Sequence, residues 1–234
     1  MMRVGIIGAM KEEIQYFKEE TANLKTEKVG NRDFLVGRWQ GIEVVIGQCG
    51  VGKVNAAITS QMMIDHFQVE LIIFTGVAGG MNPKLEIGDV VISTSSQQHD
   101  IDASSLGFSQ GTIPMSDGPS DFLADESLIE NALQSAKEVL AEEGTVMEGK
   151  ILSGDQFISN KETVQQLRKL FNGDCVEMEG AAVAQVAYTN DIPYVIIRSI
   201  SDKANGEAPT SFESFVKSSA VISAKIVGNM IKRL

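Results

Sequence analysis

Arg3-Val4-Gly5-Ile6-Ile7-Gly8-Ala9-Met10-Lys11-Glu12-Glu13 is the stretch that decides the fold. Its opening apolar run ends in glycine, which predicts a buried β-strand over residues 3–8. Charged residues follow, and Ile14 and Phe17 continue at helical spacing, so we expect a helix over residues 11–20. A buried strand that leads directly into a helix is typical of an α/β fold.

The rest of the chain repeats this alternation. Residues 34–39 and 43–48 flank Gln40-Gly41, which favours a tight turn, and we expect them to form a hairpin. Further strands are expected over 71–75, 89–93, 149–153 and 194–200, and further helices over 52–67, 126–141, 161–171 and 180–188. The order predicts one domain over residues 1–234, an α/β three-layer sandwich whose helices cover both faces of a mixed sheet.

Two segments near the middle and the end of the chain have their own signals. Thr210 and Glu213 form a capping-box pattern ahead of an apolar stripe that runs to Met230, which predicts the start of the last helix. Residues 95–121 are rich in Ser, Gly, Asp and Pro and have no sustained period. Because a loop of this length in a compact domain is usually functional, we expect a lid or an interface segment.

Composition restricts the partners of the protein. Its formal net charge of −11 would repel phosphate backbones, so we expect no nucleic acid partner. The apolar stretch from Val4 to Met10 is too short to span a bilayer and runs into charged residues, so we expect a cytoplasmic protein without a membrane contact. With two cysteines, two histidines and no zinc-ligand spacing, we expect no disulfide framework, no metal and no cofactor.

Residues 47–54, GQCGVGKV, have the spacing G-x-x-x-x-G-K of a phosphate-binding loop. That motif needs a Ser or Thr hydroxyl for Mg²⁺ after the lysine, and Val54 offers a hydrocarbon instead. We interpret the segment as a tight strand-to-helix turn whose amides could line a small-molecule site.

Two further glycine-rich segments give weaker signals. Residues 5–8, GIIG, lack the third glycine of a nicotinamide site. Residues 75–80, TGVAGG, would let a ligand or another backbone segment approach, but a plain turn explains them equally well.

Acidic residues stand where an open α/β sheet usually carries its chemistry. Glu12 and Glu13 follow the first strand, Glu177 and Glu179 precede a helix, and Asp202 follows another strand. Acids at helix starts also complement the helix dipole or act as caps, so position alone leaves a purely structural role open.

Five motifs taken together are more specific: GIIGAMxEE at 5–13, TGxAGG at 75–80, SGDxFI at 153–158, VEME at 176–179 and RSISD at 198–202. In this order they resemble the methylthioadenosine/S-adenosylhomocysteine nucleosidase branch of the purine nucleoside phosphorylase superfamily. The resemblance covers nearly the whole chain and implies one α/β domain around a twisted, partly closed mixed sheet, and a homodimer. It also implies hydrolysis of the N-glycosidic bond of small adenine thionucleosides.

The resemblance implies roles for individual residues. Glu13 corresponds to the general base for water, Asp202 to the acid that protonates N7 of adenine, and Glu179 to the carboxylate that binds the ribose hydroxyls. Phe157 and Ile158 match the purine site. The remaining candidates are Met178 against the ribose, Val51 and Phe212 at the 5'-alkylthio group, Met10, Val77, Glu177, Arg198 and Ser201 beside the catalytic groups, and Ala103, Leu106 and Pro114 in a segment that reaches across from the partner subunit.

The chain departs from the family pattern at two places. Val77 stands where a serine hydroxyl commonly helps to hold the water, so Arg198 and Glu13 would orient it alone. Ala103 and Leu106 stand where bulkier residues can occur at the alkylthio pocket, which leaves the preference between substrates open.

The chemistry sets requirements on the acids. Asp202 must be protonated near neutral pH to protonate the leaving adenine, while Glu13 must stay ionised, with Arg198 as its fixed countercharge. A glutamate at the nucleophile position repels phosphate, which favours a hydrolase over a phosphorylase.

Two alternatives remain open. A sister nucleosidase acting on aminodeoxyfutalosine would share the adenine and ribose contacts and differ at the 5' pocket. A non-catalytic adenosine-binding module of the same fold would bind without releasing adenine, although the joint presence of Glu13, Glu179 and Asp202 argues against it.

Overall fold

The computed structural model describes residues 2–141, 144–204 and 208–234, apart from the side chains of 208–211, 213 and 214. The strands are β1 (Arg3–Gly8), β2 (Ala22–Val29), β3 (Arg32–Trp39), β4 (Ile42–Gln48), β5 (Leu71–Gly80), β6 (Val90–Gln98), β7 (Asp121–Leu123), β8 (Val146–Ser153), β9 (Cys175–Glu177) and β10 (Tyr194–Asp202). The helices are α1 (Lys11–Glu20), α2 (Lys53–Phe67), α3 (Glu126–Leu140), α4 (Lys161–Phe171), α5 (Gly180–Thr189) and α6 (Ala208–Ile231), and a short 3-10 helix covers Ser104–Leu106.

The strands form one ten-stranded sheet in the order β10-β6-β8-β9-β5-β1-β4-β3-β2, and β7 pairs with β6. β10 also pairs with β5, so β5, β10, β6, β8 and β9 close into a ring. The sheet contains parallel pairs, such as β1 with β5, and antiparallel pairs, such as β6 with β10. The mixed, partly closed sheet expected for this chain is therefore confirmed.

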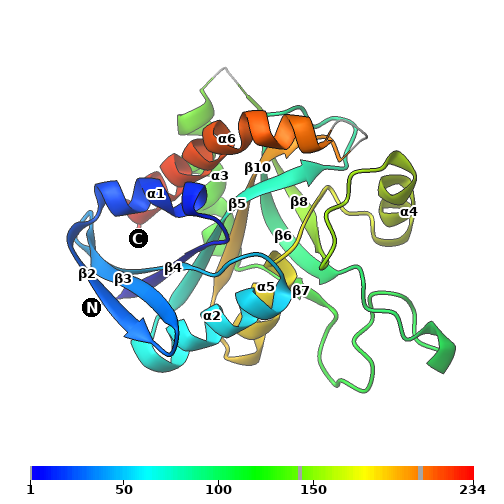
Figure 1. Cartoon of the computed structure of the whole chain (residues 1–234), viewed down its shortest axis with the longest axis horizontal. Helices are drawn as coiled ribbons and strands as arrows, with labels where there is room; N and C mark the ends of the chain where they lie inside the picture. The colour runs from blue at the N-terminus through cyan, green and yellow to red at the C-terminus, as the bar shows by residue number, and fades with distance from the viewer. Residues whose placement is uncertain (1, 142–143, 205–207) are drawn as a thin grey trace.

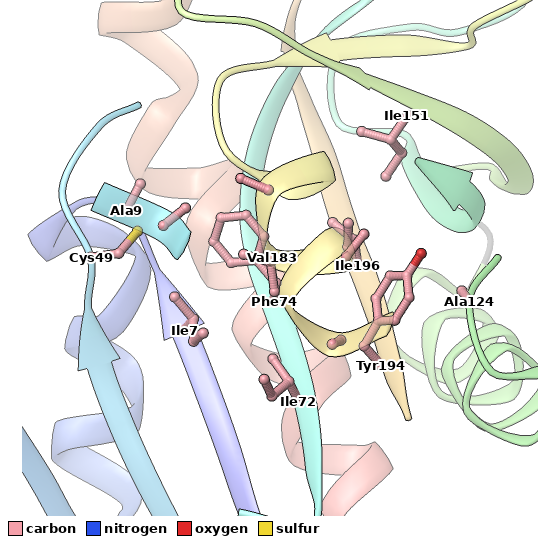
Figure 2. Close-up of a cluster of buried hydrophobic side chains, with 14 of the residues drawn as sticks. Ile7, Ala9, Cys49, Ile72, Phe74, Ala124, Ile151, Val183, Tyr194 and Ile196 are labelled. Atoms are coloured by element: carbon pink, nitrogen blue, oxygen red, sulfur yellow. The ribbon is translucent and has the colours of Figure 1, made fainter. Parts of the chain in front are cut away.

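Helices cover both faces of the sheet (Figure 1). Val4 and Ile6 of β1 pack in a buried cluster with α1, α3 and α6, whereas Ile7 packs on the other face with α2 and α5. Successive side chains of a strand point to opposite faces, so a strand covered on both sides must be apolar throughout. Figure 2 shows Phe74 of β5 and Val183 of α5 meeting in the second cluster. The predicted three-layer α/β sandwich is confirmed.

Most elements expected from the sequence are present, with shifted ends. The hairpin is β3 and β4, and both turn residues, Gln40 at φ 53° and Gly41 at φ 87°, have the positive φ that a tight hairpin turn favours. The strands β2, β7 and β9 were not expected. Residues 95–98 belong to β6 and residue 121 to β7, so the predicted loop over 95–121 was too long at both ends.

The end of β5 and the start of α6 differ from the positions predicted from the sequence. Residues 75–80 continue β5 as strand, so the plain-turn interpretation of TGVAGG is wrong. The last helix begins at Ala208, earlier than the capping-box pattern predicted, and the side chains of Thr210 and Glu213 lie outside the described residues. Within the described ranges, no helix combines the length and apolarity needed to cross a bilayer.

Candidate active site

A pocket of about 280 Å³ lies where β1, β5, β9 and β10 end and α1, α2 and α5 begin. The expected residues that line it are Met10, Glu13, Val51, Val77, Phe157, Ile158, Glu177, Met178, Glu179, Ser201, Asp202 and Phe212. The lining also includes Ala9, Ala78, Gly79, Gln156 and Val176, which the sequence did not single out individually. The small side chains at positions 9, 78 and 79 were the only sequence feature that could have pointed to these lining residues, because small residues leave room for a ligand.

Four expected residues fall outside this lining. Arg198 is fully buried behind the pocket wall. Ala103 and Leu106 flank or form the short 3-10 helix, and Pro114 lies further along the same irregular segment. The three therefore do not contribute to the pocket of their own chain, and their contact with a partner subunit stays a prediction.

Glu13 lies in the first turn of α1 with its carboxylate turned back toward β1 and β5. Oε2 accepts hydrogen bonds from the backbone N–H groups of Ala9 at 2.6 Å and Met10 at 2.9 Å, and Oε1 accepts from Val77 N–H at 3.1 Å. Burial raises the pKa of Glu13, while the charge of Arg198 and these amides oppose that rise. The result is a buried carboxylate fixed in orientation and more basic than a surface glutamate.

Gly76 of β5 makes this arrangement possible. A Cβ at Gly76 would overlap Glu13 Oε1 and would lie 2.8 Å from Arg198 Nη1. A side chain there is therefore excluded by the two charged groups that meet over the strand. The small residues of segment 75–80 therefore let other groups of the protein lie close to the strand, which is one of the two interpretations that the sequence allowed.

Arg198 has a different main partner from the one expected. Its Nη2 donates to Glu177 Oε2 at 2.6 Å, both side chains are almost fully buried, and its guanidinium lies 4.0 Å from the centroid of the Phe74 ring. Glu177 also accepts the Ser153 hydroxyl and the backbone N–H of Gly180. Arg198 is thus ion-paired to Glu177 and acts on Glu13 only through space, and protein donors already hold the Glu177 carboxylate.

Glu179 closes the side of the pocket next to α2. Its Oε1 accepts the Gly52 N–H at 2.7 Å. Burial, together with repulsion from Glu177, raises the pKa of Glu179 to about 8. Glu179 therefore binds a proton more readily than a surface glutamate does.

Asp202 stands at the end of β10, where the pairing with β5 shifts register between Ile200 and Asp202. A bulge of this kind redirects side chains. Asp202 Oδ1 accepts the Ala204 N–H at 2.7 Å, and Oδ2 accepts the Ser201 hydroxyl at 3.1 Å. Burial raises the pKa of Asp202, which favours the protonated form required of an acid.

The outer part of the pocket is apolar. The rings of Phe157 and Phe212 meet edge to face with centroids 5.9 Å apart, and Phe157 and Val51 are both half exposed. Ile158 is buried beside them. Such a surface suits a flat ring and an uncharged substituent. Among the described residues, no group of three or more His, Cys, Asp and Glu is placed to hold a metal ion.

Comparison with known proteins identifies the family of the chain. A family model described as the phosphorylase superfamily matches residues 3–233. A 5'-methylthioadenosine/S-adenosylhomocysteine nucleosidase of Staphylococcus aureus is 40% identical over 232 residues, which span 99% of this chain and 100% of that protein.

Two solved structures match the chain over its whole length. The 5'-methylthioadenosine/S-adenosylhomocysteine nucleosidase of Neisseria meningitidis, in complex with methylthio-immucillin-A, has a TM-score of 0.95 and 39% identity, with 100% of both chains covered. A futalosine hydrolase mutant of Helicobacter pylori has a TM-score of 0.92 and 35% identity, again with 100% of both chains covered. The chain therefore belongs to the phosphorylase superfamily and, within it, to the family of 5'-methylthioadenosine/S-adenosylhomocysteine nucleosidases.

Proposed function

We propose that the protein hydrolyses the N-glycosidic bond of 5'-methylthioadenosine and S-adenosylhomocysteine, releasing adenine and the thioribose product. The observation that carries the proposal is that Glu13, Glu179 and Asp202 line one pocket although they come from distant parts of the chain. The names of the relatives in the comparison support the choice of substrate.

The proposed reaction uses Asp202 and Glu13 in opposite protonation states. Asp202 donates its proton to N7 of adenine as the bond between N9 and C1' breaks and its electron pair moves onto the purine. Water adds its oxygen to C1', and Glu13 accepts the proton that water loses. Burial raises the pKa of both carboxyls, and at Glu13 the three backbone amides and the charge of Arg198 oppose that rise.

The remaining groups would hold the nucleoside in place. Glu179 would bind the ribose hydroxyls and Met178 would lie against the sugar. Phe157 would stack on the purine, whose edge Ile158 would meet through its backbone. The 5' substituent would extend toward Val51 and Phe212, on the apolar side of the pocket.

The nucleophile side of the pocket favours water over phosphate. Glu13 is buried there, and the guanidinium of Arg198 is already paired with Glu177. A carboxylate without a free cation beside it repels an anion, whereas it attracts the hydrogen atoms of water.

We also propose a homodimer. Leu106 and Met115 are apolar and strongly exposed on the segment between β6 and β7. In a dimer this segment, with Ala103 and Pro114, would reach the 5' end of the partner's pocket. Exposed apolar side chains gathered on one segment are typical of an interface.

Aminodeoxyfutalosine hydrolysis is the second candidate, because one similar structure is a futalosine hydrolase mutant. The test is to incubate the purified protein with methylthioadenosine, S-adenosylhomocysteine and aminodeoxyfutalosine and to measure free adenine by chromatography. The proposal expects the largest kcat/KM for the thionucleosides. Preference for the futalosine compound would favour the second candidate, and binding without adenine release would contradict both.

A further inference from the structure

The phosphate-loop-like turn ahead of α2 holds carboxylates of the protein itself. Gly52 N–H donates to Glu179 Oε1 at 2.7 Å, and the next amide, Lys53 N–H, donates to Asp155 Oδ1 at 2.8 Å. The start of a helix favours negative charge, and here two successive amides take one carboxylate each. One carboxylate belongs to the proposed ribose site, and the other belongs to the loop that carries Phe157.

The Lys53 side chain extends the same set of contacts. Its Nζ lies 2.6 Å from Asp100 Oδ1 and 2.9 Å from Gln98 Oε1. The side chains of Lys53 and Asp100 are each only 15% exposed, so solvent screens their attraction weakly. Burial alone would raise the pKa of Asp100, but its hydrogen bonds to Lys53 and to Asp155 N–H keep it below the usual value. Asp100 therefore stays ionised at neutral pH.

Asp100 also holds the loop that carries the proposed purine contacts. Its Oδ2 accepts the Asp155 N–H at 2.9 Å. Residues 154–160 form neither helix nor strand, so no ladder of backbone hydrogen bonds fixes Phe157 and Ile158. Asp155 thus makes two contacts: its backbone N–H donates to Asp100, and its carboxylate accepts from the backbone N–H of Lys53. Phe157 follows two residues later.

We propose that Lys53 and Asp100 are positioning residues. They hold the loop of residues 154–160, which carries Phe157, in place relative to Glu179, the carboxylate proposed to bind the ribose. Neither side chain lines the pocket, so both act through Asp155 and through the start of α2. Loss of the pair would let Phe157 shift relative to Glu179, which would weaken contacts to the adenine ring. The inference rests on the proposed function, because it assigns adenine to the site beside Phe157.

The test compares Lys53→Met and Asp100→Asn with the matched variant Lys150→Met. Lys150 Nζ makes a similar ion pair with Asp121 Oδ2, at 2.6 Å, and its side chain is 18% exposed. We expect Lys53→Met and Asp100→Asn to raise both KM for methylthioadenosine and Kd for adenine about tenfold, with a smaller effect on kcat, because small shifts of positioning groups reduce binding and rate. Lys150→Met should leave both values near wild type, and Lys53→Arg should recover most of the affinity.

Adenine binding separates this inference from the proposed function. Failure of the wild-type protein to release adenine would contradict the proposed function, while its Kd for adenine could still be compared with that of each variant. Equal Kd values in Lys53→Met, Asp100→Asn and Lys150→Met would overturn the positioning role. If Lys53→Met does not fold, Asp100→Asn decides alone, since it keeps the size of the side chain but removes its charge and one of the two oxygens that accept from Lys53 and from Asp155 N–H.

Discussion

At the scale of single residues, burial raises the pKa of both Glu13 and Asp202, but different neighbours oppose that rise at each carboxyl. Glu13 accepts three backbone N–H groups and lies in the field of Arg198. Asp202 accepts one backbone N–H and one hydroxyl, and no cation of the described part of the chain lowers its pKa. Hydrogen bonds and positive charge favour the ionised form, which is the form that the proposed reaction requires of Glu13 as the base.

The substitution Asp202→Asn tests the proposed role of Asp202 as the general acid. An amide cannot supply a proton to the leaving adenine, so we expect kcat to fall by about 10²–10⁴-fold, the range for a general acid. The amide keeps the size of the side chain, so Kd for adenine should change little. Chromatography of stopped reactions measures kcat, and calorimetry measures Kd for adenine. A variant that keeps the wild-type kcat would show that Asp202 is not the general acid.

Glu179 makes the stability of the protein depend on pH. Its pKa is raised from 4.5 to about 8 in the folded protein, so between these values the folded state holds a proton that the unfolded chain has released. This contribution is present below about pH 4.5 and is lost as the pH rises through about 8.

The variant Glu179→Gln should therefore show a weaker fall in Tm with rising pH than the wild type, because glutamine stays neutral throughout. Part of the slope should remain, since Glu13 and Asp202 also have raised pKa values and act in the same direction. Thermal denaturation at several pH values measures both proteins. Parallel Tm curves would show that Glu179 does not titrate as described.

At the scale of elements, β5 supplies one glycine, Gly76, over which the side chains of Glu13 and Arg198 meet. The substitution Gly76→Ala would place a Cβ against Glu13 Oε1, so we expect adenine release to fall by about 10²-fold as the carboxylate moves. Gly5→Ala in the neighbouring β1 is the matched control, because its Cβ would meet the flexible Met63 Sδ at 3.3 Å. Equal activity of the two variants would argue against the close approach over Gly76.

Local signals in the sequence predicted the strongly periodic elements and missed the weak ones. The helix over 161–171 matches α4, because its apolar period and the Asn160 cap are both local. β2 is mostly exposed and polar and forms through its pairing with β3, while β7 and β9 have three residues each. Strands of this kind are fixed by their neighbours, so a pattern in their own residues does not reveal them.

The sequence predicted those residues of the candidate site that stand in recognisable motifs. It did not predict which of these side chains contact each other, because that depends on their distances in the folded protein. The acidic positions and the aromatic Phe157 stand in recognisable motifs. Glu177 and Glu13 were both available partners for Arg198, and only the folded geometry shows that Glu177 makes the ion pair. The amides that hold Glu13 belong to Val77 as well as to its own loop, and backbone donors have no sequence signature.

At the scale of the whole molecule, the sheet topology explains why distant acids meet. β1, β5 and β10 are parallel neighbours, so the ends that lead to Glu13 and Asp202 lie at the same edge. β9 pairs with the end of β5 at Gly79 and Gly80 and delivers Glu177 and Glu179 to that edge. Ligands of open α/β sheets bind at the carboxyl ends of the strands, and the pocket follows this rule.

The proposed dimer makes a prediction at the same scale. The proposed interface includes the 5' end of the pocket beside Val51, and on the α2 helix that follows it Val54 and Ile58 are apolar and 69% and 41% exposed. We expect sedimentation to give a mass about twice 25.3 kDa, and Val54→Glu to shift it toward the monomer because a buried charge without a partner is costly. Val221→Glu, on α6 at 39% exposure, is the control. A monomeric wild type, or equal behaviour of both variants, would contradict an interface on α2.

The identity of the sugar product in phosphate buffer tests the central claim most directly. A neutral acid at Asp202 and an ionised Glu13 that repels anions predict free 5-methylthioribose and adenine from methylthioadenosine, at a rate that added phosphate does not change. Mass spectrometry of the product in ¹⁸O-labelled water should place the label on the sugar. Accumulation of 5-methylthioribose 1-phosphate, or a rate that rises with phosphate, would contradict the account.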